Sequence, residues 1–255
     1  MVRGSRGGYT RLMLRTLLTC FVLLTAAPAM AQGPVVFAAS SLKTALDDVA
    51  VVWEMRGNPA PVLVYAGSSA LARQIDQGAP ADLVFTASAD WMTWLRSREL
   101  IVPGSEIALL GNELVLIGPA GDAPLALDAD AVAARLGTDR LAMALVDAVP
   151  AGQYGRAALE ALGLWDRLAP SVAQTDNVRA ALALVARQET PLGIVYATDA
   201  LAEPRVSVLA TFPEDSHPPI EILLALVQDT NRARAFYTFL QSPEARAIFV
   251  AQGFK

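Results

Sequence analysis

The 255-residue sequence has few of the residues on which most enzyme and metal sites depend. It contains one cysteine, Cys20, and one histidine, His217. No cluster of cysteine and histidine has the spacing of a metal site, and no GxGxxG, P-loop or GxSxG motif follows a strand-like run. We interpret His217, which lies in a proline-rich turn, as a solvated loop residue. The sequence therefore predicts a protein that is not an enzyme and has no cofactor.

The first 31 residues are typical of a secretory signal peptide. Four arginines precede an apolar run over residues 17–27, and Ala29 and Ala31 are the small residues that a cleavage site requires. The apolar run is about half as long as the roughly 20 residues that a membrane-spanning helix needs. We expect cleavage after Ala31, which removes Cys20, so the exported chain contains no disulfide.

Positive charge is scarce in the remaining 224 residues. Without the four arginines of the signal peptide, 16 basic residues stand against 25 acidic ones, which gives a net charge of −9 with histidine neutral. This balance argues against nucleic acid and against an anionic membrane surface as partners. An anion site on such a chain has to depend on local dipoles, because the overall charge repels anions.

Short apolar runs alternate with amphipathic segments along the exported chain. Strand-like runs over residues 35–39, 61–66 and 83–87 are each followed by apolar residues at helical spacing. This alternation predicts βαβ units, mainly parallel sheets and an α/β fold. Two long apolar stretches, over residues 107–118 and 206–227, interrupt the alternation. We interpret them as passages between two lobes.

Four of the predicted helices begin at small or hydroxyl residues directly after an apolar run. These helix starts lie at residues 40–41, 67–69, 149–152 and 176–178. Helix N-termini carry unpaired N–H groups and the positive end of the helix dipole, so several that converge form a site for a small anion. Ligands of open α/β sheets bind at this end of the strands. Taken alone, each of these serines or Asp-Asn pairs is more often a helix cap.

The helix starts and one strand end offer donors without charged side chains. The donors are the hydroxyls of Ser41 and Ser68, the backbone amides of Ala151 and Val178, and the phenol of Tyr196. A pocket of donors favours a deprotonated tetrahedral dianion such as molybdate or sulfate, whereas monoprotonated phosphate needs a carboxylate acceptor. The nearest carboxylates are those of Asp147 and Asp176, and Asp176 leaves the exclusion of phosphate open.

Six segments resemble those of periplasmic molybdate-binding proteins, the solute-binding components of molybdate ABC importers. They follow in order at residues 36–42, 67–75, 78–83, 149–152, 191–196 and 212–217. The resemblance implies a type II periplasmic-binding-protein fold, in which two α/β lobes with mainly parallel sheets close on one oxyanion. We expect lobe 1 over residues 32–112 and 216–255, and lobe 2 over residues 113–215.

The resemblance also implies the ligand contacts and the partners. Matched segment by segment, the family's two serine hydroxyls, two backbone amides and tyrosine fall on Ser41, Ser68, Ala151, Val178 and Tyr196. Further backbone donors are expected at Ala39, Ser40 and Ser69. The ligand would be molybdate, with tungstate as a second ligand, so that the metal is bound only as its oxyanion. The implied protein is a periplasmic monomer that delivers this ligand to an ABC transporter permease.

Two alternative functions remain open. The first is a binding protein for another solute, such as sulfate or ferric ion, although iron capture in related folds uses adjacent tyrosines and Tyr196 follows a valine. The second is a phosphate- or sulfate-ester hydrolase with Ser41 as its nucleophile, for which the sequence shows no partner base. The chain also has Leu145 and Val146 where the family often has Asp-Pro. The ranking of molybdate, tungstate and sulfate therefore remains open.

Overall fold

The computed structural model describes Met1 and residues 32–255. The predicted signal peptide falls almost entirely on residues 2–31, so its prediction lies outside the described residues. Among the helices that are described, none has the length and apolar character that a membrane-spanning segment requires.

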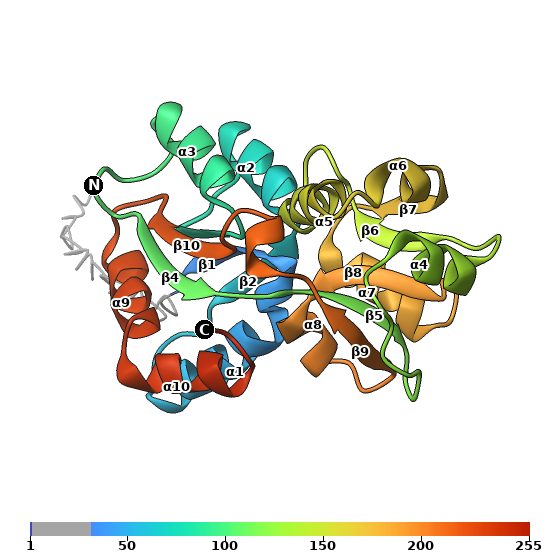
Figure 1. Ribbon diagram of the computed structural model, residues 1–255. Coiled ribbons are helices and arrows are strands. Elements are labelled where there is room, and N and C mark those ends of the chain that lie inside the picture. Colours follow the sequence, from blue (N-terminus) through green and yellow to red (C-terminus); the bar gives the residue numbers. More distant parts are fainter. Residues whose placement is uncertain (2–31) are drawn as a thin grey trace. The chain divides into compact units, whose positions relative to one another are not determined.

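Residues 32–255 contain two five-stranded sheets, and we call each sheet with its flanking helices a lobe (Figure 1). In spatial order, the first sheet consists of β2 (Val62–Ala66), β1 (Val35–Ala39), β3 (Leu83–Thr86), β10 (Glu221–Leu226) and β4 (Ile107–Gly111). The second consists of β7 (Val172–Thr175), β6 (Leu141–Ala144), β8 (Leu192–Tyr196), β5 (Leu114–Pro119) and β9 (Val206–Thr211). The predicted two-lobed α/β fold is thus confirmed.

Each sheet is mixed, with one strand antiparallel to the other four, which agrees with the expectation of mainly parallel sheets. In the first sheet β2, β1 and β3 are parallel, whereas β10 is antiparallel to both β3 and β4. The second sheet repeats this arrangement, with β7, β6 and β8 parallel and β5 antiparallel to both β8 and β9. The antiparallel pairings all involve strands at the passages between the lobes, which a pattern of local βαβ units does not reveal.

Helices cover both faces of each sheet. In the first lobe these are α1 (Lys43–Met55), α2 (Ser68–Asp76), α3 (Ala89–Ser97), α9 (Asn231–Leu240) and α10 (Pro243–Ala251). In the second lobe they are α4 (Ala129–Leu136), α5 (Pro150–Ala161), α6 (Trp165–Leu168), α7 (Val178–Ala186) and α8 (Ala197–Leu201). The short 3-10 helices are η1 (Ser40–Leu42), η2 (Ala169–Ser171) and η3 (Glu214–Ser216).

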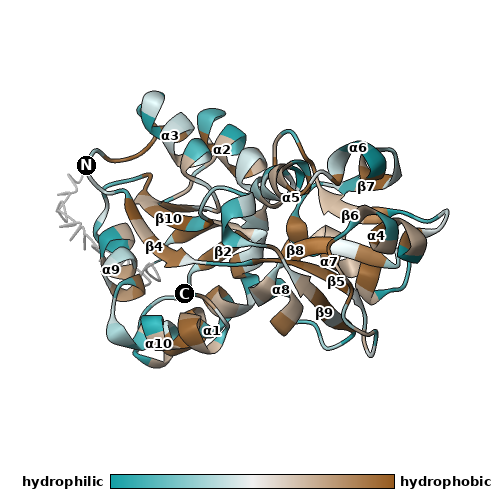
Figure 2. Cartoon of the chain, viewed as in Figure 1, coloured by the Kyte–Doolittle hydropathy of each residue, from teal (hydrophilic) through white to brown (hydrophobic). Residues whose placement is uncertain are grey.

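Apolar side chains of the first sheet face two separate cores. Phe37 belongs to the core formed with α2 and α3, whereas Val36 and Ala38 belong to the core that contains Trp53 and Phe236 of α1 and α9. Neighbouring residues of a strand point to opposite faces of its sheet, which explains this division. Figure 2 shows the same pattern, with apolar strands inside and polar residues on the outer surfaces of the helices.

The chain passes between the lobes at two places. The first passage, from β4 in the first sheet to β5 in the second, consists of Asn112 and Glu113 (Figure 1). The return passage, from β9 to β10, contains η3. The side-chain amide of Asn112 donates to Thr198 Oγ1 at 2.8 Å, which fixes the first passage to the second lobe. Both passages fall within the two apolar stretches that interrupt the sequence pattern.

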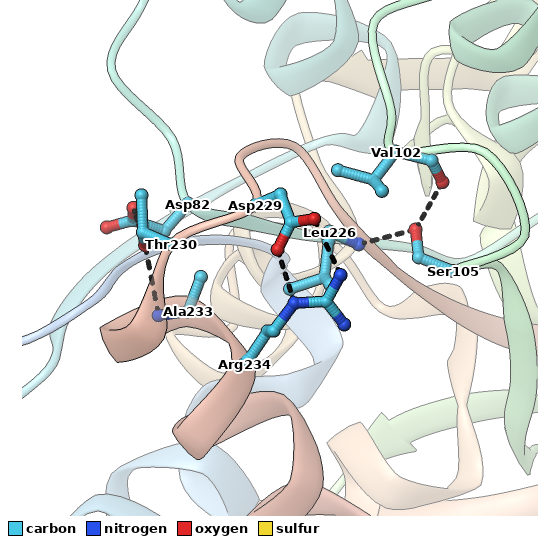
Figure 3. A network of polar contacts seen from close by, with 8 residues as sticks. All are labelled: Asp82, Val102, Ser105, Leu226, Asp229, Thr230, Ala233 and Arg234. Atoms are coloured by element: carbon cyan, nitrogen blue, oxygen red, sulfur yellow. Dashed lines mark hydrogen bonds and ion pairs between the residues drawn. The ribbon is translucent and has the colours of Figure 1, made fainter.

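A network of polar contacts holds the returning strand in the first lobe (Figure 3). Ser105 Oγ donates to the carbonyl of Val102 at 2.7 Å and accepts from the amide of Leu226 at 3.1 Å. Beyond this strand, Thr230 Oγ1 caps α9 and donates to the buried carboxylate of Asp82 at 3.5 Å. The C-terminal segment is therefore an integral part of the first lobe.

Candidate functional site

The four predicted helix starts meet at one small cavity between the lobes. The first lobe lines it with Ala39, Ser40, Ser41, Ala66, Gly67, Ser68 and Ala87, and the second with Val149, Pro150, Ala151, Val178 and Tyr196. Its volume is about 10 Å³. A space of this size holds one compact group rather than an extended molecule.

The topology of the sheets explains why the candidate donors meet. Ser41 follows β1 within η1, and Ser68 is the first residue of α2 after β2. In the second lobe Ala151 is the second residue of α5 after β6, Val178 begins α7 after β7, and Tyr196 ends β8. Parallel strands end at the same edge of a sheet, so these junctions lie together.

Two of the candidate donors are buried hydroxyls without a partner. Ser41 and Tyr196 are each 1% exposed, and neither hydroxyl has a hydrogen-bond partner within the described part of the chain. A buried polar group left unpaired costs about 1–3 kcal/mol, which is why such groups are rare. Both hydroxyls line the cavity, so a bound acceptor would satisfy them.

The hydroxyl of Ser68 has one hydrogen-bond partner and can still donate its own proton. Its Oγ accepts a hydrogen bond from the amide of Ala87 at 3.0 Å, which joins the start of α2 to the end of β3. The hydroxyl proton is not used in this bond and is available to a ligand. Ser68 is not the N-cap of its helix, because that position is occupied by Gly67.

Ala151 and Val178 contribute their backbone amides. They are the second and first residues of α5 and α7, where an amide has no acceptor within the helix. The cap of α7 is satisfied by Asn177, whose Oδ1 accepts from the amide of Ala180 at 3.0 Å. Among the additional backbone donors that we expected, Ala39 and Ser40 line the cavity, and Ser69 is buried beside it without lining it.

Among the residues that the structure describes, none of those that line the cavity has a charged side chain. The two carboxylates nearest in sequence are exposed, and Asp147 is paired with Arg156 at 2.9 Å. Burial, with smaller contributions from Tyr154 and Asp199, raises the pKa of Tyr196 well above its ordinary value, so its hydroxyl remains a donor at neutral pH. The site can therefore bind an anion that accepts hydrogen bonds from every side, and none of its lining residues offers a carboxylate as acceptor for a ligand proton.

The cavity lacks the groups that hydrolysis with Ser41 as the nucleophile would need. None of its lining residues is a histidine, a lysine or a carboxylate that could act as a base. His217 does not line it and packs against Tyr154, with 6.0 Å between the ring centroids and the ring planes tilted by 58°. The side chain of His217 is half-buried rather than fully solvated, which corrects our expectation.

Several residues that line the cavity were not among the candidate donors predicted from the sequence. The lining residues that sequence analysis did not assign to the site are Ala66, Gly67, Ala87, Val149 and Pro150. Most of them belong to the helix starts already recognised, but Ala87 lies at the junction of β3 and α3, which was not among them. A small residue at the end of a third parallel strand was the available signal.

Comparisons with known proteins agree with this architecture. The family model for bacterial extracellular solute-binding proteins matches residues 34–255. Molybdate-binding protein ModA of Escherichia coli is 43% identical over 224 residues, covering 86% of this chain and 87% of that protein. Molybdate-binding protein ModA of Haemophilus influenzae is 41% identical over 232 residues, with 86% and 88% coverage.

A solved structure shows the same fold. The periplasmic molybdate-binding protein of Azotobacter vinelandii superposes with a TM-score of 0.77 at 24% identity, covering 87% of this chain and 98% of that one. The matches extend over nearly all the described residues and thus include both lobes and the cavity between them. The chain belongs to the bacterial extracellular solute-binding protein family, whose members are non-enzymatic components of transport systems.

Proposed function

We propose that this protein binds molybdate outside the cytoplasm and delivers it to the permease of an ABC importer, with tungstate as a second ligand. The observation that carries the proposal is the cavity between the lobes, where the buried hydroxyls of Ser41 and Tyr196 lack partners and no carboxylate is present. A tetrahedral dianion fits this set of donors. The two ModA relatives, named for molybdate binding, favour molybdate among such anions.

Each candidate donor has a place in the proposed complex. The hydroxyls of Ser41, Ser68 and Tyr196 and the amides of Ala151 and Val178 donate to the four oxygens of the anion. The amides of Ala39, Ser40 and Ser69 are further candidates. Because the protein contacts only oxygen atoms, the metal is held as its oxyanion. The dipoles of α2, α5 and α7 supply the positive potential that the net charge of the chain does not.

The proposed division of the chain makes binding depend on closure of the lobes. Lobe 1 comprises residues 32–112 and 216–255, and lobe 2 residues 113–215, with both boundaries in the segments between the sheets. Since each lobe supplies part of the donors, the anion is fully coordinated only when the lobes are closed. We expect the protein to act as a periplasmic monomer after removal of the signal peptide at Ala31.

The anion can be identified by measuring the Tm of residues 32–255 in the presence of molybdate, tungstate, sulfate and phosphate. A ligand at 100 times its Kd stabilises the folded state by about 2.7 kcal/mol. For a chain of this size that corresponds to a Tm increase of roughly 5–11 °C. We expect such an increase with molybdate and tungstate and almost none with phosphate. Equal stabilisation by phosphate would contradict a pocket of donors, and a response to sulfate alone would assign the protein to another solute.

The unpartnered hydroxyls provide a test of the site itself. Ser41→Ala and Tyr196→Phe each remove one hydrogen bond to an anion, worth about 1.5 kcal/mol, and should weaken molybdate binding about tenfold in isothermal titration. The Tm of the unliganded variants should stay constant or rise slightly, because each deleted hydroxyl has no other partner.

A serine elsewhere in the chain provides the control. Ser242 Oγ accepts from the amide of Ala245 at 3.2 Å at the start of α10, outside the cavity. Ser242→Ala should therefore lower the unfolding free energy by about 1 kcal/mol and leave molybdate affinity unchanged. If both Ser41→Ala and Tyr196→Phe bind molybdate like the wild type, the proposed site is wrong.

A further inference from the structure

Arg179 connects the two lobes behind the cavity. It is the second residue of α7, and its side chain is 21% exposed. One guanidinium nitrogen, Nη2, donates to the backbone carbonyl of Ser41 in the first lobe at 3.3 Å. Another, Nε, donates to Asp199 Oδ1 in the second lobe at 2.5 Å. Arg179 does not line the cavity, so it is not itself a ligand contact.

The second partner of Arg179 continues the connection to Tyr196. Asp199 is fully buried, and its Oδ2 accepts a hydrogen bond from the amide of Tyr196 at 3.2 Å. Burial raises the pKa of this carboxyl, whereas the charge of Arg179 acts in the opposite direction. A chain of contacts thus leads from Ser41 through Arg179 and Asp199 to Tyr196. The residues at its two ends, Ser41 and Tyr196, are those that line the cavity with buried hydroxyls that have no partner in the described part of the chain.

We infer that Arg179 is a positioning residue that holds the closed lobes together and fixes Ser41 and Tyr196 around the anion. The inference rests on the proposed function, because it assigns a role in ligand retention. Separation of the lobes would remove the Ser41 carbonyl from the guanidinium and leave the contact with Asp199 intact. Since the charge of Arg179 is balanced by Asp199, its contribution to binding comes from position rather than from attraction of the anion.

The chemistry of the guanidinium explains why arginine stands here. Its donors diverge from a rigid plane and can serve two acceptors that belong to different lobes. A lysine has a single charged nitrogen at the end of a flexible chain. At position 179 a lysine could retain the ion pair with Asp199 but would not also hold the carbonyl of Ser41. Arg179→Lys therefore separates the role in closure from the role in folding.

The test is stopped-flow measurement of molybdate binding to the wild type and to Arg179→Lys. Tryptophan fluorescence can report closure, because the indole N–H of Trp91 in the first lobe donates to the carbonyl of Ala148 in the second at 2.8 Å. We expect the dissociation rate to rise about tenfold, equivalent to about 1.4 kcal/mol, and the association rate to remain within about twofold. The Tm of the unliganded variant should be close to that of the wild type.

Two further variants complete the experiment. Arg187→Lys makes the same replacement at the other end of α7, where Arg187 pairs with Glu189 at 2.7 Å, and should leave both rates unchanged. The double variant Arg179→Gln with Asp199→Asn removes both charges together and should also dissociate faster. Wild-type dissociation rates in Arg179→Lys and in the double variant would contradict the inference alone. A wild type that does not bind molybdate would contradict the proposed function as well.

Discussion

Replacement of Gly67 by alanine is expected to weaken molybdate binding at least 100-fold. A Cβ atom at Gly67 would lie 2.7 Å from the carbonyl oxygen of Asp176 and 3.2 Å from Val149 Cγ2, and both of these residues belong to the second lobe. The added methyl group would keep the lobes apart and remove the anion from the amides of Ala151 and Val178. Loss of two hydrogen bonds to a charged ligand costs about 3 kcal/mol or more.

The same substitution should not destabilise the unliganded protein. The backbone of Gly67 has φ −65° and ψ 142°, which alanine adopts without strain. Removal of a glycine restricts the unfolded chain, which stabilises the folded state by about 0.4–1 kcal/mol. Gly67 is also the N-cap of α2, where alanine is less favourable than glycine, so this gain is largely offset. The expected signature is therefore a large loss of affinity in isothermal titration with little change in Tm.

Gly78, which follows α2 in the same lobe, provides the matched control. Its replacement by alanine is expected to lower stability and leave affinity unchanged, the opposite of the result expected for Gly67→Ala. It has φ +88°, and a Cβ there would meet nothing within 4 Å. Gly78→Ala should lower the unfolding free energy by about 1–2 kcal/mol through backbone strain and leave molybdate affinity unchanged. Binding by Gly67→Ala at the wild-type level would show that the lobes do not approach one another as described.

Local sequence patterns predicted the fold class because they depend on neighbouring residues. The strand-like runs that we expected at residues 35–39 and 83–87 overlap β1 and β3 closely, since period-2 exposure and helical spacing are visible within one element. The antiparallel pairings of β10 and β5 were not predicted. They arise where the chain passes between the lobes, and the partner of such a strand lies far away in sequence.

In the candidate site, too, local sequence patterns identify some residues, whereas other features depend on contacts between residues that are distant in sequence. Ser41 and Val178 could be identified because each follows a strand at the start of a helix. The bridge from Arg179 to Ser41 could not, because it spans 138 residues of sequence and depends on how closely the two lobes approach one another. The steric requirement at Gly67 has the same origin, although the residue itself belongs to a recognised helix start.

Gly152, beside Ala151 in the first turn of α5, has a packing role that the sequence analysis did not identify. A Cβ at Gly152 would fall well inside contact distance of the carbonyl oxygens of Ala144 and Leu145. The glycine thus allows the first turn of α5 to pack directly against the end of β6.

Gly152→Ala is accordingly expected to lower both stability and affinity. The atoms in the way belong to the backbone and cannot rotate aside, so the start of α5 must move and carry the amide of Ala151 away from the anion. Overpacking of this kind costs about 3 kcal/mol, at the upper end of its usual range. For a chain of this size the Tm should fall by roughly 6–12 °C. Calorimetry of the unliganded protein and titration with molybdate measure the two effects.

Gly155→Ala, one turn further along α5, is the control for Gly152→Ala. It tests whether an added methyl group anywhere in this helix lowers stability and affinity. A Cβ at Gly155 would meet Met143 Cε at 2.7 Å, which is the flexible end of a side chain that can turn away. Alanine is also favoured over glycine within a helix by about 1 kcal/mol, so Gly155→Ala should change stability little and leave molybdate affinity intact. If Gly152→Ala were equally harmless, the amide of Ala151 would not depend on close packing of the helix start, and its place in the proposed site would be lost.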